Sequence, residues 1–253
     1  TIIVPAWAGF EVLQHMMDFF NKATIGDAAM KHSYGMVFCS AKTPIRKADS
    51  LARELADNIK DLKHGRNHNL FDYAVLESID YPTEALDKFW QTQFGGLAEQ
   101  RRPLAIRMGS LPISRADIAQ CLDALPRTAM YRLLESLVAT PVNKLDADQV
   151  ASLSAESLRE LAKTSPNMLP HIHYAHILSS LSAKEKNALS TLGQLFQEFV
   201  PSETDEADEL CNLPHTSPAF WLHLVELFDY LAPELPNNTN TIANTTDIKE
   251  GKQ

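Results

Sequence analysis

The clearest hydrophobic pattern in the chain lies between Tyr34 and Leu76. Tyr34–Cys39 is an apolar run of strand length. Apolar side chains then recur every three or four residues over Ile45–Leu62, with charged side chains between them, which is typical of a helix with one buried face. Pro44 suits the first position of that helix and Gly65 a stop after it. With a second apolar run at Leu70–Leu76, the pattern predicts strand, helix, strand.

The residues before this unit continue the alternation. Thr1–Trp7 is apolar and predicts a strand, and Ala8–Lys22 carries an apolar stripe at helical spacing. Asn21–Lys31 is a polar connection. Residues 1–82 therefore form one expected section of alternating strands and helices.

The pattern after residue 82 is helical. Thr83–Phe94 predicts an amphipathic helix, followed by a linker to residue 113. Prolines separate the later periodic stretches, as helix breakers do. We expect an all-α bundle over residues 114–232 and a disordered tail over 233–253, which is polar and has no periodicity. The helices predicted in the bundle are Ser114–Leu125, Arg127–Ala139, Asp146–Lys163, Asn167–Leu181, Ala183–Val200 and Ser217–Leu231.

Composition narrows the class of protein. The 253 residues carry a formal charge of −9, which argues against a free-standing nucleic-acid binder, although His32–Arg66 is locally basic. Cys39, Cys121 and Cys211 are widely spaced, so we expect free thiols in a reducing cytoplasm. No apolar run reaches the roughly 18 residues of a membrane span, and no membrane partner is expected.

One stretch resembles known families. The strand led by Gly35, the Lys42-Thr-Pro44-Ile45 run and the Lys63-His-Gly65-Arg66-Asn67 turn look like the second half of a palm-type nucleotide cyclase. This pattern is shared by GGDEF diguanylate cyclases and by the large, polymerase-like subunit of type III CRISPR effector complexes. The run from Gly35 is more like the CRISPR family, although Ser40 stands where that family tends to have His.

The resemblance implies a fold and an activity. The fold class is α+β: a partial ferredoxin-like palm followed by a helical bundle domain. The intact protein would make cyclic oligoadenylate from ATP with two Mg or Mn ions, and would associate with other type III effector subunits, guide RNA and target RNA. In both families the strand after the catalytic Gly-Gly-Asp turn looks like Thr1–Trp7, so we expect the metal-binding carboxylates upstream of Thr1. Gly95-Gly96 is followed by Leu97 and cannot hold a metal, so no catalytic residue is expected here.

The resemblance also implies nucleotide-binding residues. Arg66 matches the arginine that contacts phosphates in the GGDEF motif, and Lys63 or Lys60 would be the accompanying lysine. Lys42, at a strand end, is a fourth candidate. Helix-end lysines are also common because they complement the helix dipole, so a purely structural role is the alternative.

Two further groups have a functional and a structural interpretation. His171, His173 and His176 have helical spacing, but without a fourth ligand a metal site is the less favoured interpretation. Arg101, Arg102 and Arg107 would line either an RNA-facing surface or a solvated connector. For the whole chain, the alternatives to a cyclase fragment are a non-catalytic scaffold of the ribonucleoprotein and a diguanylate cyclase with a helical extension.

Overall fold

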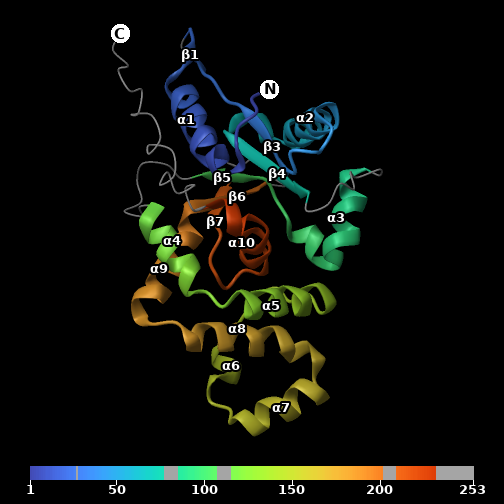
Figure 1. The fold of residues 1–253 in the computed structure, drawn as a ribbon, viewed down its shortest axis with the longest axis vertical. Helices are drawn as coiled ribbons and strands as arrows, with labels where there is room; N and C mark the ends of the chain where they lie inside the picture. Colours follow the sequence, from blue (N-terminus) through green and yellow to red (C-terminus); the bar gives the residue numbers. More distant parts are fainter. Residues whose placement is uncertain (27, 77–84, 107–114, 202–208, 232–253) are drawn as a thin grey trace, which may run out of the picture.

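The computed structural model describes residues 1–26, 28–76, 85–106, 115–201 and 209–231. Its centre is a five-stranded sheet with helices on both faces, and a group of helices lies beyond one end of it (Figure 1). The strands follow the order β3-β4-β5-β6-β7. Their bounds are Ser33–Cys39 (β3), Leu70–Leu76 (β4), Leu104–Ile106 (β5), Phe196–Val200 (β6) and Glu209–Asn212 (β7).

The predicted strand–helix–strand unit is confirmed. β3 and β4 pair in parallel, and α2 (Ile45–Asp61) connects them. Helix and sheet touch at Gly35, where an added Cβ would lie 1.8 Å from the carbonyl oxygen of Ala52. No side chain larger than hydrogen fits there without separating α2 from β3. β4 is buried along its whole length, as expected of a strand covered on both faces.

The other three strands join this unit from distant parts of the chain. β5 pairs antiparallel with β4 and β6, and β7 pairs antiparallel with β6. The prediction of one helix over Ala183–Val200 is therefore wrong: α9 covers Ala183–Leu195, and the chain then enters β6. Phe199 is fully buried beside Ile59 of α2, so tertiary packing selects the strand there. An all-α description of 114–232 does not hold.

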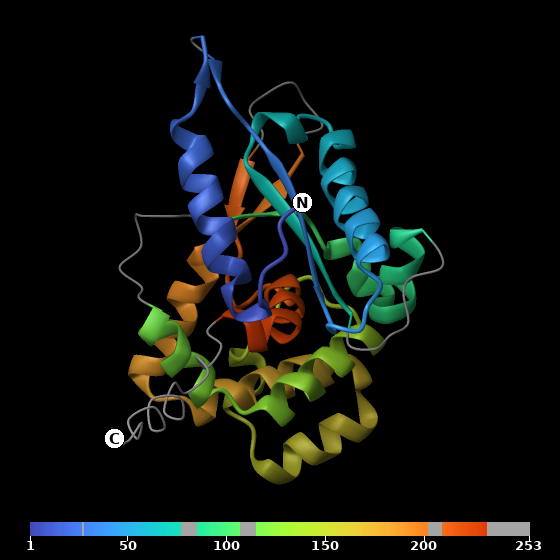
Figure 2. The same cartoon turned by 45° about the horizontal axis from the view of Figure 1, so that its top comes forward.

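Two helices cover one face of the sheet and α2 covers the other (Figures 1 and 2). On the first face, Phe10 of α1 (Gly9–Lys22) contacts the rings of Phe38 and Phe71, at centroid distances of 5.7 and 6.1 Å. Tyr230 of α10 (Pro218–Leu231) stacks on Phe38 at 4.1 Å. One hydrophobic cluster therefore joins the start of the chain to its last described helix.

The predicted strand over Thr1–Trp7 is wrong. Thr1–Pro5 has no regular secondary structure, and Ala6–Ala8 is a single 3-10 turn before α1. No strand among the described residues pairs with this segment, so its apolar composition does not produce a ladder. The chain is a mixed α+β protein, and a ferredoxin-like palm is not confirmed. The polar connection after α1 contains a small hairpin, β1 (Thr24–Ile25) with β2 (Ala28–Ala29).

Most predicted helices are present with shifted ends. The stretch Asp146–Lys163 is the exception, because it forms two helices: Ser154 caps the second one by accepting a hydrogen bond from the Ser157 amide. The predicted starts Thr83 and Ser114 and the tail 233–253 lie outside the described residues. The observed helices are α3 (Leu86–Phe94), α4 (Arg115–Ala124), α5 (Arg127–Ala139), α6 (Asp148–Ala151), α7 (Ala155–Thr164) and α8 (Leu169–Ser180), with 3-10 turns η3 (Gly95–Gln100) and η4 (Pro166–Met168).

Candidate phosphate-binding site and a buried polar network

The turn after α2 is shaped by one glycine. The helix ends at Asp61, His64 takes a left-handed conformation with φ 61°, and Gly65–Asn67 forms a 3-10 turn. A Cβ on Gly65 would lie 2.0 Å from the carbonyl oxygen of Ile59. The turn therefore folds back tightly against the last turn of α2. Only glycine permits that approach.

This fold-back brings three of the predicted site residues together. The Nε of Arg66 donates to the carbonyl oxygen of Lys60 over 3.2 Å, so Arg66 satisfies one of the open carbonyls at the helix end. Lys60 Nζ lies 2.7 Å from Asp57 Oδ1, and Lys63 is exposed beside them. We call Lys60, Lys63 and Arg66 the α2 cationic end.

The α2 cationic end can bind an anion. Arg66 is exposed, and no described residue accepts a hydrogen bond from its two terminal nitrogens. A guanidinium held through Nε presents those nitrogens as a fork, which suits a phosphate. The contact of Arg66 with the Lys60 carbonyl is also what the structural alternative predicts, because there these charges only stabilise the end of the helix. The geometry thus supports both roles.

Lys42 does not belong to this group. It lies between the end of β3 and the start of α2, whereas Arg66 follows the other end of α2. The helix spans 17 residues, or about 25 Å at its usual rise. Lys42 and Arg66 therefore cannot hold the same phosphate. The structure therefore brings together three of the four candidate residues, at the end of α2.

The histidines of α8 make separate contacts. The Nδ1 of His171 accepts a hydrogen bond from the Asp146 amide at 3.1 Å, and the Nδ1 of His173 lies 3.4 Å from the Ser136 hydroxyl. Burial lowers the pKa of both imidazoles. Among the described residues, no three His, Cys, Asp or Glu side chains are grouped as metal ligands.

Arg101 contradicts the sequence-based expectation most clearly. Neither a solvated connector nor an RNA-facing surface describes it, because its side chain is only 4% exposed. Its Nη1 donates to Asp72 Oδ1 over 2.6 Å, and its guanidinium lies over the rings of Trp90 and Tyr73, at 4.1 and 4.8 Å from their centroids. Burial alone would lower the pKa of Arg101, but the facing Asp72 carboxylate raises it. Arg102 is partly exposed, and Arg107 lies outside the described residues.

The pair of Arg101 and Asp72 belongs to a network of buried polar side chains that also joins the sheet to α10. We call Asp72, Tyr73, Arg101, His223 and Glu226 the buried polar network. The fully buried Tyr73 hydroxyl donates to Glu226 Oε2 over 2.9 Å and lies 2.7 Å from Nδ1 of His223. A phenol has one proton, so the His223 contact requires an Nδ1–H donor and leaves Nε2 as an acceptor. That Nε2 has no partner among the described residues. Burial lowers the pKa of His223 and raises that of Tyr73, so both groups stay neutral.

The buried polar network is structural. Tyr73 and Arg101 are enclosed by protein. A weak signal for it exists in the sequence, because Asp72 interrupts an otherwise apolar buried strand. A buried carboxylate needs a partner, but periodicity cannot tell that the partner is 29 residues further along the chain.

A partly buried carboxylic acid lies on β6. Glu198 faces Leu104 of β5 and Cys211 of β7 in the register of the sheet, and its Oε1 has no partner among the described residues. Burial raises the pKa of Glu198 to about 7, and the charge of Arg102 offsets only part of that rise. The hydrophobic pattern does not indicate this group, since it predicts a helix at Glu198.

Comparisons with known proteins identify no relative. No protein-family model matches the chain, and neither a curated protein nor a solved structure matches it. None of the helices in the described part of the chain combines the length and the apolar character needed to cross a membrane.

Proposed function

We propose that this chain is part of the large, polymerase-like subunit of a type III CRISPR effector complex, whose palm makes cyclic oligoadenylate from ATP. The chain would contribute the α2 cationic end to the nucleotide site and a helical region to the contacts with other subunits. The metal-binding carboxylates would come from residues outside it. The proposal starts from the resemblance over Gly35–Asn67 and is supported by two features of the structure.

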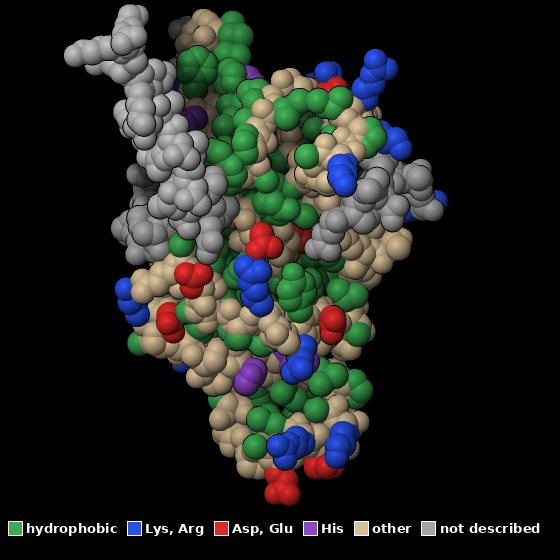
Figure 3. All heavy atoms as spheres, in the orientation of Figure 1, with side chains coloured by type: hydrophobic (Ala, Val, Ile, Leu, Met, Phe, Trp, Pro, Cys, Tyr) green, Lys and Arg blue, Asp and Glu red, His purple; other side chains and the backbone are tan. Residues whose placement is uncertain are grey.

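The observation that carries the proposal is an uncovered apolar segment beside the outer strand of the sheet. Ile2 and Ile3 are 59% and 70% exposed, and Val4 and Trp7 are 36% and 39% exposed. Hydrophobic side chains gather over this part of the molecule in Figure 3. Large apolar side chains in one continuous segment mark a surface that another element covers.

In this proposal, the remainder of the palm packs on this segment. The hydroxyl of Thr1 is hydrogen-bonded to Asp49 on α2, and Gly9 approaches the ring of Phe38 on β3. Since α2 and α1 lie on opposite faces of the sheet, the segment passes the outer side of β3. β3 pairs only with β4 among the described strands, so its other edge has no strand partner there.

The second supporting feature is the geometry of Arg66. A triphosphate held in a palm needs cations to balance the oxygens that its metals leave exposed. Bound Mg or Mn would activate the attacking 3′-hydroxyl and stabilise the leaving pyrophosphate. The terminal nitrogens of Arg66, with Lys60 and Lys63 beside them, can hold and orient such a phosphate group.

The first test is the coding sequence immediately upstream of Thr1. An upstream reading frame that continues into Thr1 and encodes Gly-Gly-Asp-Asp just before it supports a palm completed by the same polypeptide. A turn without carboxylates removes the catalytic proposal and leaves the scaffold interpretation. Guanosine instead of adenosine in the product of the intact protein would favour a diguanylate cyclase.

The second test addresses the residues. In the intact protein, Arg66→Ala should raise the KM for ATP about tenfold or more, because a charge-assisted contact is worth roughly 1.5–3 kcal/mol. Arg46→Ala is the matched control: it removes an exposed arginine at the other end of α2 and should leave ATP kinetics unchanged. Equal kinetics for the two variants would exclude Arg66 from the nucleotide site.

A further inference from the structure

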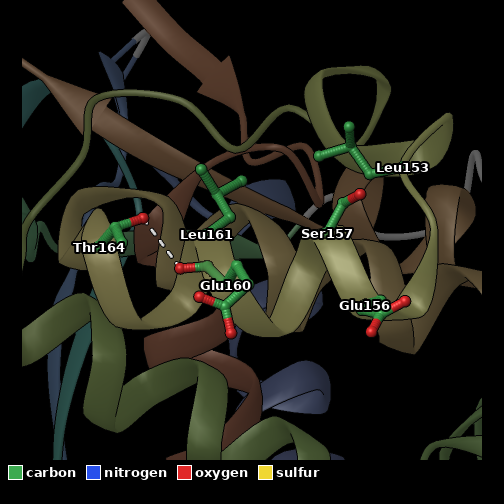
Figure 4. A pocket seen from close by; sticks show the side chains of 6 residues that line it. All are labelled: Leu153, Glu156, Ser157, Glu160, Leu161 and Thr164. Carbon is green, nitrogen blue, oxygen red and sulfur yellow. Dashed lines mark hydrogen bonds between the residues drawn. The ribbon is translucent and has the colours of Figure 1, made fainter.

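An open groove runs along one face of α7, far from the α2 cationic end (Figures 1 and 4). Its volume is about 440 Å³. We call this feature the α7 groove. It is lined by Leu153, Glu156, Ser157, Glu160, Leu161 and Thr164.

The helix that forms the groove is weakly anchored. α7 contains no buried residue, whereas the neighbouring α8 buries Ile177 completely. In the groove, Leu153 is 37% exposed and Leu161 is only partly buried. The apolar side of α7 is thus incompletely covered by the described part of the chain.

The groove has the geometry of a helix-packing surface. Ser157, Leu161 and Thr164 are spaced by four and three residues, which places them in one row on α7, and Leu153 lies just before the helix, ahead of its cap Ser154. Small or apolar side chains in such a row form a ridge against which a second helix packs. The row from Ser157 to Thr164 is about 10 Å long, so it would contact roughly two turns of a partner helix.

The charged side chains of the groove are acidic and favour a basic partner. Glu156 and Glu160 line it, and no Lys or Arg does. Glu160 pairs with Lys163 over 3.0 Å, but both side chains are about two-thirds exposed or more, and such pairs contribute little and exchange easily. Two carboxylates beside an apolar row disfavour a nucleic-acid backbone and favour cations on the partner.

We propose that the α7 groove is a docking site for an amphipathic helix of a partner protein, with an apolar ridge flanked by Lys or Arg. The apolar ridge packs against Leu153 and Leu161, and the basic side chains pair with Glu156 and Glu160. This docking site is independent of the nucleotide chemistry proposed above.

The test uses the full chain and a fluorescent helical peptide of about 18 residues, long enough to form a helix, with a leucine ridge flanked by lysines. Fluorescence anisotropy should show saturable binding. Replacing both acids (E156K with E160K) should weaken it about tenfold, because two attractions become repulsions. The matched control, E54K with D61K on α2, makes the same change in net charge and should leave the affinity within about twofold.

A charge-swapped peptide separates docking from non-specific attraction. With glutamates in place of lysines, the peptide should bind the E156K/E160K variant at least about fivefold more tightly than the wild-type chain. Leu153→Asn removes the apolar contact without adding a charge, so it should weaken binding of the lysine peptide. The circular-dichroism spectrum and the melting temperature should stay unchanged, since Leu153 is partly exposed. Absence of saturable binding, equal losses in the two double variants, or no effect of Leu153→Asn would overturn the proposal.

Discussion

The Tyr73 hydroxyl makes a prediction about how the sheet and α10 are held together. Tyr73→Phe removes one oxygen and keeps the ring against Arg101. It leaves Nδ1–H of His223 and a carboxylate oxygen of Glu226 without the partner they have in the native protein. A net hydrogen bond contributes about 1 kcal/mol, and a buried group left unsatisfied costs roughly 1–3 kcal/mol. We expect a loss of about 2–4 kcal/mol in the free energy of unfolding.

The assay is equilibrium unfolding in urea, followed by far-ultraviolet circular dichroism. With a slope of about 3 kcal/mol per molar urea for a chain of this size, the midpoint should fall by about 1 M with the slope unchanged. Tyr131→Phe is the matched control, because Tyr131 is 50% exposed and has no hydrogen bond among the described residues. Its midpoint should stay close to that of the wild-type protein.

A double-mutant cycle tests the hydrogen bond between Tyr73 and Glu226. If the Tyr73 hydroxyl donates to Glu226, then Tyr73→Phe and Glu226→Ala, which removes the acceptor, should couple by roughly 1 kcal/mol or more. A Tyr73→Phe variant within about 0.5 kcal/mol of the wild-type protein would refute the reasoning, since it would show that the hydroxyl does not link β4 to α10.

Two further predictions concern buried charges. Asp72→Ala leaves the enclosed Arg101 without its carboxylate and should lower the free energy of unfolding by about 3–5 kcal/mol. Asp229→Ala is the control, because it breaks an exposed pair with Arg127 and should lower the free energy of unfolding by less than about 1 kcal/mol. Similar urea midpoints for the two variants would contradict this prediction. Glu198 has a pKa of about 7 in the folded protein and an ordinary value near 4.5 when unfolded, so the folded state binds more protons between these values and loses stability as pH rises. The free energy of unfolding of Glu198→Gln, measured relative to that of the wild-type protein, should therefore rise by up to about 3 kcal/mol between pH 4.5 and pH 8. If the difference in free energy between the two proteins does not change with pH, the raised pKa of Glu198 is disproved.

The sequence predicts the local part of the fold well. The helix Ile45–Asp61 and the strands on either side of it follow from periodicity, because each has an uninterrupted apolar face and clear boundaries. The tight turn at Gly65 was also indicated by residue type. These elements need no information from distant parts of the chain.

The errors arise where distant contacts decide the structure. Phe196–Val200 continues the apolar pattern of α9, and only its pairing with β5 and β7 makes it a strand. Conversely, Thr1–Pro5 has a strand-like composition but no partner strand among the described residues. Arg101 is the third case, since its burial depends on Asp72 and Trp90 from other elements. Periodicity reports which face is apolar, but not what covers it.

The position of α10 changes how the resemblance over residues 1–81 should be interpreted. That region contains the nucleotide-site candidates, yet Phe38 and Tyr73 obtain their cover from Tyr230 and His223, about 150 residues or more downstream. A chain ending at residue 82 would expose both rings and lose β5, β6 and β7 from the sheet. Because Arg66 is held by the end of α2, and α2 packs on this same sheet, the geometry of the α2 cationic end depends on the helical part of the chain. A substitution in α10 should therefore change the geometry of the α2 cationic end through the sheet, without any direct contact.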